Sequence, residues 1–150
     1  MRLWHKDLIP YLPKNQLISQ WRELCCIAKN ISVNGTPNHI LVNKIMDYSI
    51  DHFYLYSTLV TVEMKDRGYK IKNKSLSEFT SNLFDYASTF FPKPDGKQVT
   101  IETLYSDWHN DRYFIQCYFN LQEKHDCKGI KDNEWEYLQK FVASKGSINF

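Results

Sequence analysis

The stretch from residue 51 to residue 67 constrains the fold most, because the helix it would form is apolar on nearly every face. Its large apolar residues are Phe53, Tyr54, Leu55, Tyr56, Leu59, Val60, Val62 and Met64. A helix of this kind needs neighbours on all sides, so it belongs in the middle of the fold. Lys65 and Arg67 near its end, with Gly68 just beyond, predict that the helix stops there.

Four other segments have apolar residues at the spacing of a helical face. The first follows Asn15 as a predicted N-cap, and the second follows residues 75–78, which have the form of a capping box, and stops at Pro92. The apolar positions of the four segments are Leu17, Trp21, Leu24, Cys25 and Ala28; Phe79, Leu83, Tyr86, Ala87 and Phe90; Phe114, Cys117, Tyr118 and Leu121; and Trp135, Leu138 and Val142. Residues 30–38 resemble a loop. Periodicity does not decide between strand, helical turn and buried loop for residues 39–48, and it leaves residues 99–105 ambiguous.

We therefore predict an all-α fold, a compact single domain of four to five helices with irregular connecting loops, over residues 1–150. A chain of 150 residues has the usual size of one domain. A hydrophobic fraction of 43% excludes a disordered chain. No apolar run is long enough for a signal peptide or a membrane span, so we expect a cytoplasmic protein without membrane contact.

Cysteine spacing argues against both a disulfide framework and a metal site. The four cysteines form no CxxC pair, and two of them are adjacent in sequence, which fits a reducing compartment. Cys117, His125 and Cys127 could be assembled into a metal site, but their spacing matches no zinc signature. We expect no metal and no cofactor.

Basic residues are unevenly distributed along the chain, although the net charge is only +2. Residues 1–100 hold 13 basic and 9 acidic side chains, whereas residues 101–150 hold 6 and 8. One basic group comprises Lys65, Arg67, Lys70, Lys72 and Lys74, and another comprises Arg2, Lys6, Lys14, Arg22 and Lys29. Either group could follow a phosphate backbone, and from charge alone an ordinary solvated surface is the simpler interpretation.

Two stretches resemble a known family. They are Met1-Arg2-Leu3-Trp4 with Leu17-Ile18-Ser19-Gln20-Trp21-Arg22-Glu23-Leu24, and Asp66-Arg67-Gly68-Tyr69-Lys70-Ile71. In these residues the chain resembles the pyrimidine dimer DNA glycosylase family. The resemblance implies an enzyme that removes a damaged base from double-stranded DNA and then cuts the strand at the abasic site. No obligate protein partner is evident from the sequence.

The family resemblance implies that the nucleophile is the α-amine of the first residue and that Glu23 is the catalytic carboxylate. An α-amino group has a reference pKa of about 7.7–8.0, so much more of it is unprotonated near neutral pH than of a lysine. In the phage member of the family the amine belongs to a threonine exposed by removal of methionine. Here Met1 precedes Arg2, and large residues in that position generally protect methionine from removal. We therefore expect Met1 itself to carry the amine.

Other residues are candidates for DNA contacts. Arg2 and Arg22 match family arginines that hold phosphates beside the lesion. His5 and His39 are candidates because histidine titrates near neutral pH, and Arg112 is a candidate because it opens the fourth predicted helix.

The chain departs from the phage enzyme at two positions that face DNA there. Gln16 replaces a histidine and Cys26 replaces an arginine. These differences leave the choice of lesion open.

Two other functions remain open at this stage. One is a non-catalytic module that binds distorted DNA or RNA. Such a module would still bind nucleic acid after its amine was blocked, but it would not cleave it. The other is a helical protein-interaction domain, for which DNA binding would show little or no dependence on salt.

Overall fold

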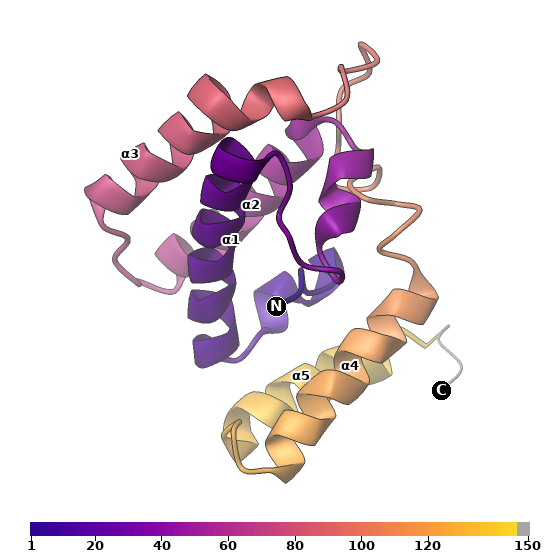
Figure 1. Ribbon diagram of the computed structural model, residues 1–150. Coiled ribbons are helices and arrows are strands. Elements are labelled where there is room, and N and C mark those ends of the chain that lie inside the picture. The colour runs from indigo at the N-terminus through magenta and orange to yellow at the C-terminus, as the bar shows by residue number, and fades with distance from the viewer. Residues whose placement is uncertain (147–150) are drawn as a thin grey trace.

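The computed structural model describes residues 1–146, which form helices and turns without a strand (Figure 1). The α-helices are α1 (Lys14–Asn34), α2 (Ile50–Asp66), α3 (Asn73–Ser81), α4 (Asp111–Asp126) and α5 (Asp132–Ser144). The shorter helical elements are η1 (Lys6–Tyr11), η2 (Asn43–Asp47), η3 (Asn82–Tyr86) and η4 (Ala87–Phe90). The predicted all-α fold is confirmed. No helix among these residues has the length and hydropathy needed to span a bilayer.

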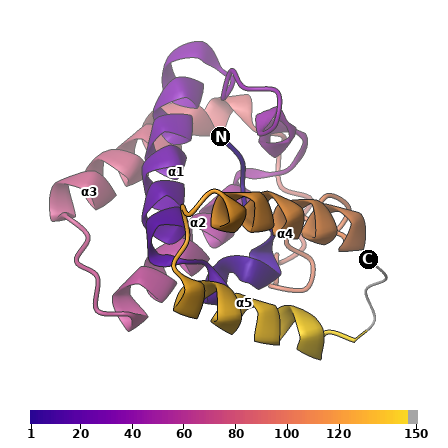
Figure 2. The same cartoon turned by 90° about the horizontal axis from the view of Figure 1, so that it is seen from below.

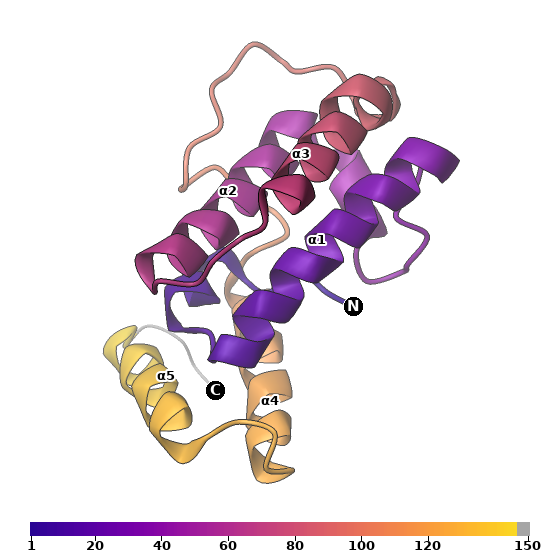
Figure 3. The ribbon, with the colours of Figure 1, turned by 90° about the vertical axis from the view of Figure 1, so that its left-hand side faces the viewer.

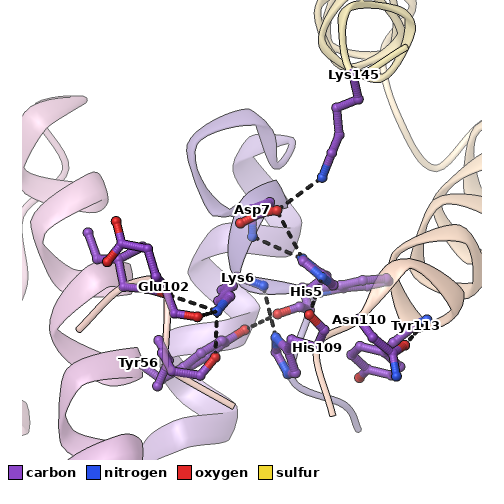
Figure 4. Close-up of polar contacts among 12 residues, drawn as sticks. His5, Lys6, Asp7, Tyr56, Glu102, His109, Asn110, Tyr113 and Lys145 are labelled. Carbon is purple, nitrogen blue, oxygen red and sulfur yellow. Dashed lines mark hydrogen bonds and ion pairs between the residues drawn. The ribbon is translucent and has the colours of Figure 1, made fainter. Parts of the chain in front are cut away.

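The helices form two groups that meet at the N-terminal segment. Figures 1 and 3 show α1, α2 and α3 lying together, with the pair α4 and α5 at one end of this group. Element η1 lies between the groups and contacts both α2 and α5. An ion pair of 3.0 Å between Lys145 Nζ and Asp7 Oδ2 also ties the end of α5 to η1 (Figure 4).

Helix α2 lies in the core, as its apolar composition predicts. Phe53, Tyr56 and Val60 are fully buried. Burial does not extend all round the helix, however, because Tyr54 and Val62 are each about half exposed. The helix ends at Asp66 and is followed by Gly68 in the left-handed conformation, as the sequence predicts.

Two predicted helix starts are wrong by two or three residues. Helix α1 begins at Lys14, before Asn15, and the Lys14 N–H donates to the Glu134 carboxylate at 2.7 Å. A tertiary contact therefore takes the place of a local cap. Helix α3 begins at Asn73, so Ser75 lies inside the helix and forms no capping box.

The chain continues from α3 into a wider helical turn, η3, which changes which of the following side chains are buried. Residues 82–86 form a π-helical turn, which holds more residues than an α-turn and rotates the following side chains. Leu83 and Ala87 are buried as predicted, but Tyr86 is 60% exposed and Phe90 50% exposed. Phe91 is buried in their place.

Helix α1 continues to Asn34, into the stretch that resembled a loop. It ends at Gly35, whose φ of 75° reverses the chain and leads into the segment that contains His39. Residues 43–47 of that segment form η2, which resolves one ambiguous stretch as a short helix.

The second ambiguous stretch, residues 99–105, consists of turns and extended backbone. Lys6 holds it in place, because its Nζ donates to the carbonyls of Ile101 (2.8 Å), Glu102 (3.1 Å) and Leu104 (2.7 Å), as Figure 4 shows in part. These carbonyls therefore find their hydrogen-bond donor in one ammonium group and not in a regular helix or strand.

Candidate active site

The first residues of the chain run between α1, α2 and α4, and in Figure 2 the N-terminus emerges between α1 and α4. Leu3 is fully buried, and its carbonyl accepts a hydrogen bond of 2.6 Å from the Tyr113 hydroxyl of α4. The Trp4 carbonyl accepts another from the Tyr56 hydroxyl of α2. The backbone next to the terminal amine is thus fixed from two sides.

Gln20 of α1 fixes the same segment from a third side. Its side chain is fully buried, and its Oε1 accepts hydrogen bonds from the Trp4 N–H (2.8 Å) and the Tyr56 hydroxyl (3.0 Å). Its Nε2 donates to the Arg2 carbonyl (3.0 Å) and to Glu23 Oε2 (3.3 Å). One buried amide therefore joins the N-terminal segment to the carboxylate one helical turn further along α1.

The Glu23 carboxylate lies in a half-buried position beside the N-terminus. Burial raises its pKa, because the charged form loses solvation. The Met1 ammonium, a hydrogen bond from the Arg2 backbone, Lys124 and His39 each lower it. Positive groups of the N-terminal segment, of the segment after α1 and of α4 therefore all act on one carboxylate.

The positive charge of Met1 lowers the pKa of Glu23, although the two groups do not form an ion pair in the described part of the chain. The ion pairs within 4.0 Å in the described part of the chain do not include one between these two groups. Met1 as a whole residue is 39% exposed, so the N-terminal residue is partly open to solvent.

Arg2 and Arg22 occupy different environments. The Arg2 guanidinium lies 5.5 Å from the centre of the Trp4 ring. Its charge also lowers the pKa of Tyr113 and of Cys117 of α4, so it lies close to that helix. Arg22 is exposed on α1 next to Glu23. Of these two candidates, Arg22 is the one freely available to a phosphate.

His5 is buried, with 3% of its surface exposed, and its ring is bonded to protein on both sides (Figure 4). Its Nδ1 accepts from the Asp7 N–H at 3.1 Å, so its Nε2 carries the proton and donates to the His109 carbonyl at 2.9 Å. Burial lowers its pKa to about 4. His5 is thus a neutral structural residue near neutral pH, and we do not include it in a DNA-binding surface.

The other two predicted DNA-binding residues are both at least partly exposed. His39 is half-exposed, and its charge reaches Glu23. Arg112 is exposed at the start of α4. Lys124, near the opposite end of the same helix, is the basic residue whose charge reaches Glu23. Arg112 and Lys124 are twelve positions apart in α4, which is roughly 18 Å at 1.5 Å per residue.

Gln20 and Lys124 are the residues of this site that sequence reasoning missed. Gln20 could have been found, because it falls between Leu17 and Leu24 on the apolar face of α1 and a buried amide needs partners. Nothing local to Lys124 distinguishes it from other lysines of the chain. Only the packing of α4 against the N-terminal segment brings it close to Glu23.

The described residues hold no cluster of three or more histidine, cysteine, aspartate or glutamate side chains arranged for a metal ion. Cys117 is buried while Cys127 is exposed, and all four cysteines are free thiols. The chemical groups gathered at the N-terminus are an amine, a carboxylate and several cations.

Comparison with known protein families gives one match. A family described as pyrimidine dimer DNA glycosylase matches residues 1–76. The matched range contains the N-terminal segment, α1 and α2, and therefore Met1, Gln20 and Glu23, whereas α4 and α5 lie outside it. No curated protein and no solved structure matches the chain.

Proposed function

The chain belongs to the pyrimidine dimer DNA glycosylase family, and from this premise we propose that it removes the damaged base and cuts the resulting abasic site through the Met1 amine. Membership makes the protein a DNA glycosylase that acts on damaged DNA. The proposal adds the abasic-site lyase activity, the covalent intermediate and the residues that carry them.

The proposed reaction begins with the nitrogen lone pair of Met1. It attacks C1′ of the damaged nucleotide, the glycosidic bond breaks, and the base leaves with the bonding electrons and takes up a proton. The attached nitrogen loses a proton, its lone pair forms a double bond to C1′ as the C1′–O4′ bond breaks, and O4′ takes up a proton. An iminium between the Met1 nitrogen and C1′ remains.

Strand cleavage follows from the same iminium. Its positive nitrogen acidifies the C2′ proton, and removal of that proton forms a C2′–C3′ double bond as the C3′–O bond breaks. The 3′ phosphate departs with the downstream strand. Water finally hydrolyses the iminium and restores the free amine.

Glu23 is the proposed acid and base of these steps. Its carboxylate stabilises the positive charge that develops on the sugar, and it moves protons during iminium formation and elimination. Its raised pKa supports this role, because a larger fraction of the carboxyl groups then carries a proton to donate near neutral pH.

Basic residues around the N-terminus are proposed to hold the DNA. Arg22, His39 and Lys124 lie near Glu23 and are suited to the phosphates beside the lesion. Arg112 would contact a more distant phosphate, and Arg2 would act from its packed position over Trp4. The damaged nucleotide must leave the base stack to reach the amine, which costs a few kcal/mol.

The observation that best supports the proposal is the buried Gln20 amide. It holds the backbone of residues 2–4 and the Glu23 carboxylate together, so the terminal amine has little freedom to move away from the carboxylate. Fixed geometry of this kind is what an amine nucleophile and its proton carrier require.

Borohydride trapping on a duplex with a central abasic site tests the proposal. Protein with a free, native N-terminus should form a covalent complex with DNA, and peptide mapping should place the bond on Met1. Acetylation of the N-terminus should abolish the complex. A bond mapped to a lysine, or trapping that survives acetylation, would contradict the mechanism.

Glu23→Gln tests the carboxylate separately. Strand cleavage should fall by about 10²- to 10⁴-fold, the usual contribution of a general acid or base. Glu136→Gln is the matched control, since Glu136 is an exposed glutamate of α5, and it should cleave at the wild-type rate.

A further inference from the structure

Besides the basic residues near Glu23, a separate group of basic residues lies at the N-terminal end of α1, where the turn between α4 and α5 approaches that helix. A cavity of about 540 Å³ opens there. Its wall includes Lys14 of α1, Tyr69 of the segment between α2 and α3, and Lys128 and Lys131 of the α4–α5 turn. Figure 2 shows this turn beside the first residues of α1.

Positive charge exceeds negative charge in this cavity. Three lysines line it, against the single carboxylate of Glu134. That carboxylate already accepts the Lys14 backbone N–H at 2.7 Å. The neighbouring Asp132 carboxylate is occupied as well, at 2.9 Å from His125 Nε2. The lysine ammonium groups are therefore only partly neutralised.

Gln16 supplies a polar group without a partner. Gln16 lines the cavity, and its amide oxygen is buried and has no hydrogen-bond partner among the described residues. A primary amide can turn its NH₂ or its oxygen toward a bound group, so Gln16 can donate to an anion. A phosphate oxygen only accepts hydrogen bonds, so Gln16 would meet it with its NH₂ group, after a rotation that exchanges the positions of the amide oxygen and nitrogen.

The cavity is aligned with the proposed active site. Gln16, Gln20 and Glu23 lie on one stripe of α1, because they are separated by four and then three residues. Gln16 is therefore about 10 Å from Glu23 along the helix axis. Successive phosphates of one DNA strand advance by about 3.4 Å along the duplex, so the cavity would meet a phosphate about three nucleotides away.

We propose that this cavity binds a backbone phosphate of the damaged DNA. The inference rests on the proposed function, because that function puts DNA across Glu23. Lys128 and Lys131 lie outside the range that matches the family, so this contact is contributed by the C-terminal part of the chain. Lys124, whose charge reaches Glu23, extends the positive charge of the turn toward the active site.

The salt dependence of DNA binding tests the site. The probe is a duplex with a tetrahydrofuran abasic-site analogue, and its binding is measured by fluorescence anisotropy over a range of NaCl concentrations. Each phosphate contact contributes a slope of about −0.9 to log K against log[NaCl]. The double variant Lys128→Gln/Lys131→Gln removes the contact with this one phosphate and should therefore lower the magnitude of the slope by about 0.9. Lys128→Arg/Lys131→Arg should keep it.

The matched control is Lys93→Gln/Lys97→Gln, which removes two exposed lysines from the segment before α4. Figures 1 and 3 show that segment at the opposite end of the molecule from the α4–α5 turn. Its slope should equal that of the wild type. A wild-type slope in the Lys128→Gln/Lys131→Gln variant would overturn the phosphate site.

Borohydride trapping separates this inference from the proposed chemistry. Trapping at Met1 together with an unchanged slope would reject the phosphate site and leave the mechanism intact. A reduced slope without any trapping would support the phosphate site and reject the amine mechanism.

Discussion

Replacing Gln20 by leucine should separate the N-terminal segment from α1. The Gln20 side chain is fully buried, and leucine has a similar size, so packing changes little while four hydrogen bonds disappear. The Trp4 N–H loses its partner in a buried position, and the Arg2 carbonyl loses its partner in a part-buried one. The Tyr56 hydroxyl keeps its bond to the Trp4 carbonyl.

The expected loss of stability follows from these unpaired groups. A buried donor or acceptor without a partner costs about 1–3 kcal/mol, so the two together cost about 2–6 kcal/mol. Burial of the leucine side chain offsets about 1–2 kcal/mol of that cost. We therefore expect the free energy of unfolding to fall by about 3 kcal/mol.

Urea unfolding measures this change, with Gln139→Leu as the control because Gln139 is an exposed glutamine of α5. The control should stay within about 0.5 kcal/mol of the wild type. Cleavage by folded Gln20→Leu protein should also fall by about 10²-fold, since the amine and Glu23 are no longer held together. A Gln20→Leu variant as stable and as active as the control would refute the reasoning.

Three further predictions concern stability. Burial lowers the pKa of His5 to about 4 and that of His109 to about 2, so the unfolded chain binds more protons than the folded one below its histidine pKa. Stability should fall as the pH falls, by about 2 kcal/mol per histidine between pH 7 and pH 5, and urea unfolding at both values checks this. Lys6→Met should cost about 2 kcal/mol and speed amide hydrogen exchange in residues 100–109, because three carbonyls lose their ammonium donor; unchanged exchange would count against that role. Gly35→Ala should cost about 1–2 kcal/mol in thermal unfolding, because φ is 75° and the new Cβ would lie 3.0 Å from the Phe90 ring, and a neutral result would mean that the ring moves aside.

The sequence predicts the helices well because their apolar spacing is a local property. Helix α2 and its end before Gly68 follow directly from that spacing, and α4 and α5 lie where Phe114 and Trp135 predict them. The exposure of Tyr86 could not be predicted, because it depends on a single wide turn that rotates the residues after it. The start of α1 depends on Glu134, which is 120 residues away in the chain.

The candidate site is predictable only in part, for the same reason. Met1 and Glu23 follow from the family resemblance, and the structure brings their charges within reach of each other. His5 has the chemistry of a DNA-binding residue, but its surroundings are decided by the distant residue His109, whose carbonyl accepts a hydrogen bond from the His5 ring. Lys124 is assigned to the site only by the packing of α4.

The contacts that hold the N-terminal segment also set the order in which the protein can be assembled. Leu3 and Tyr113 are separated by 110 residues, and His5 and His109 by 104. At about 5–20 residues per second, a ribosome needs roughly 5–20 s to make the second partner after the first. The proposed nucleophile is therefore made more than 100 residues before the partners that fix it, so a chain that has not yet reached Tyr113 carries the amine without the α4 contact that holds its segment in place.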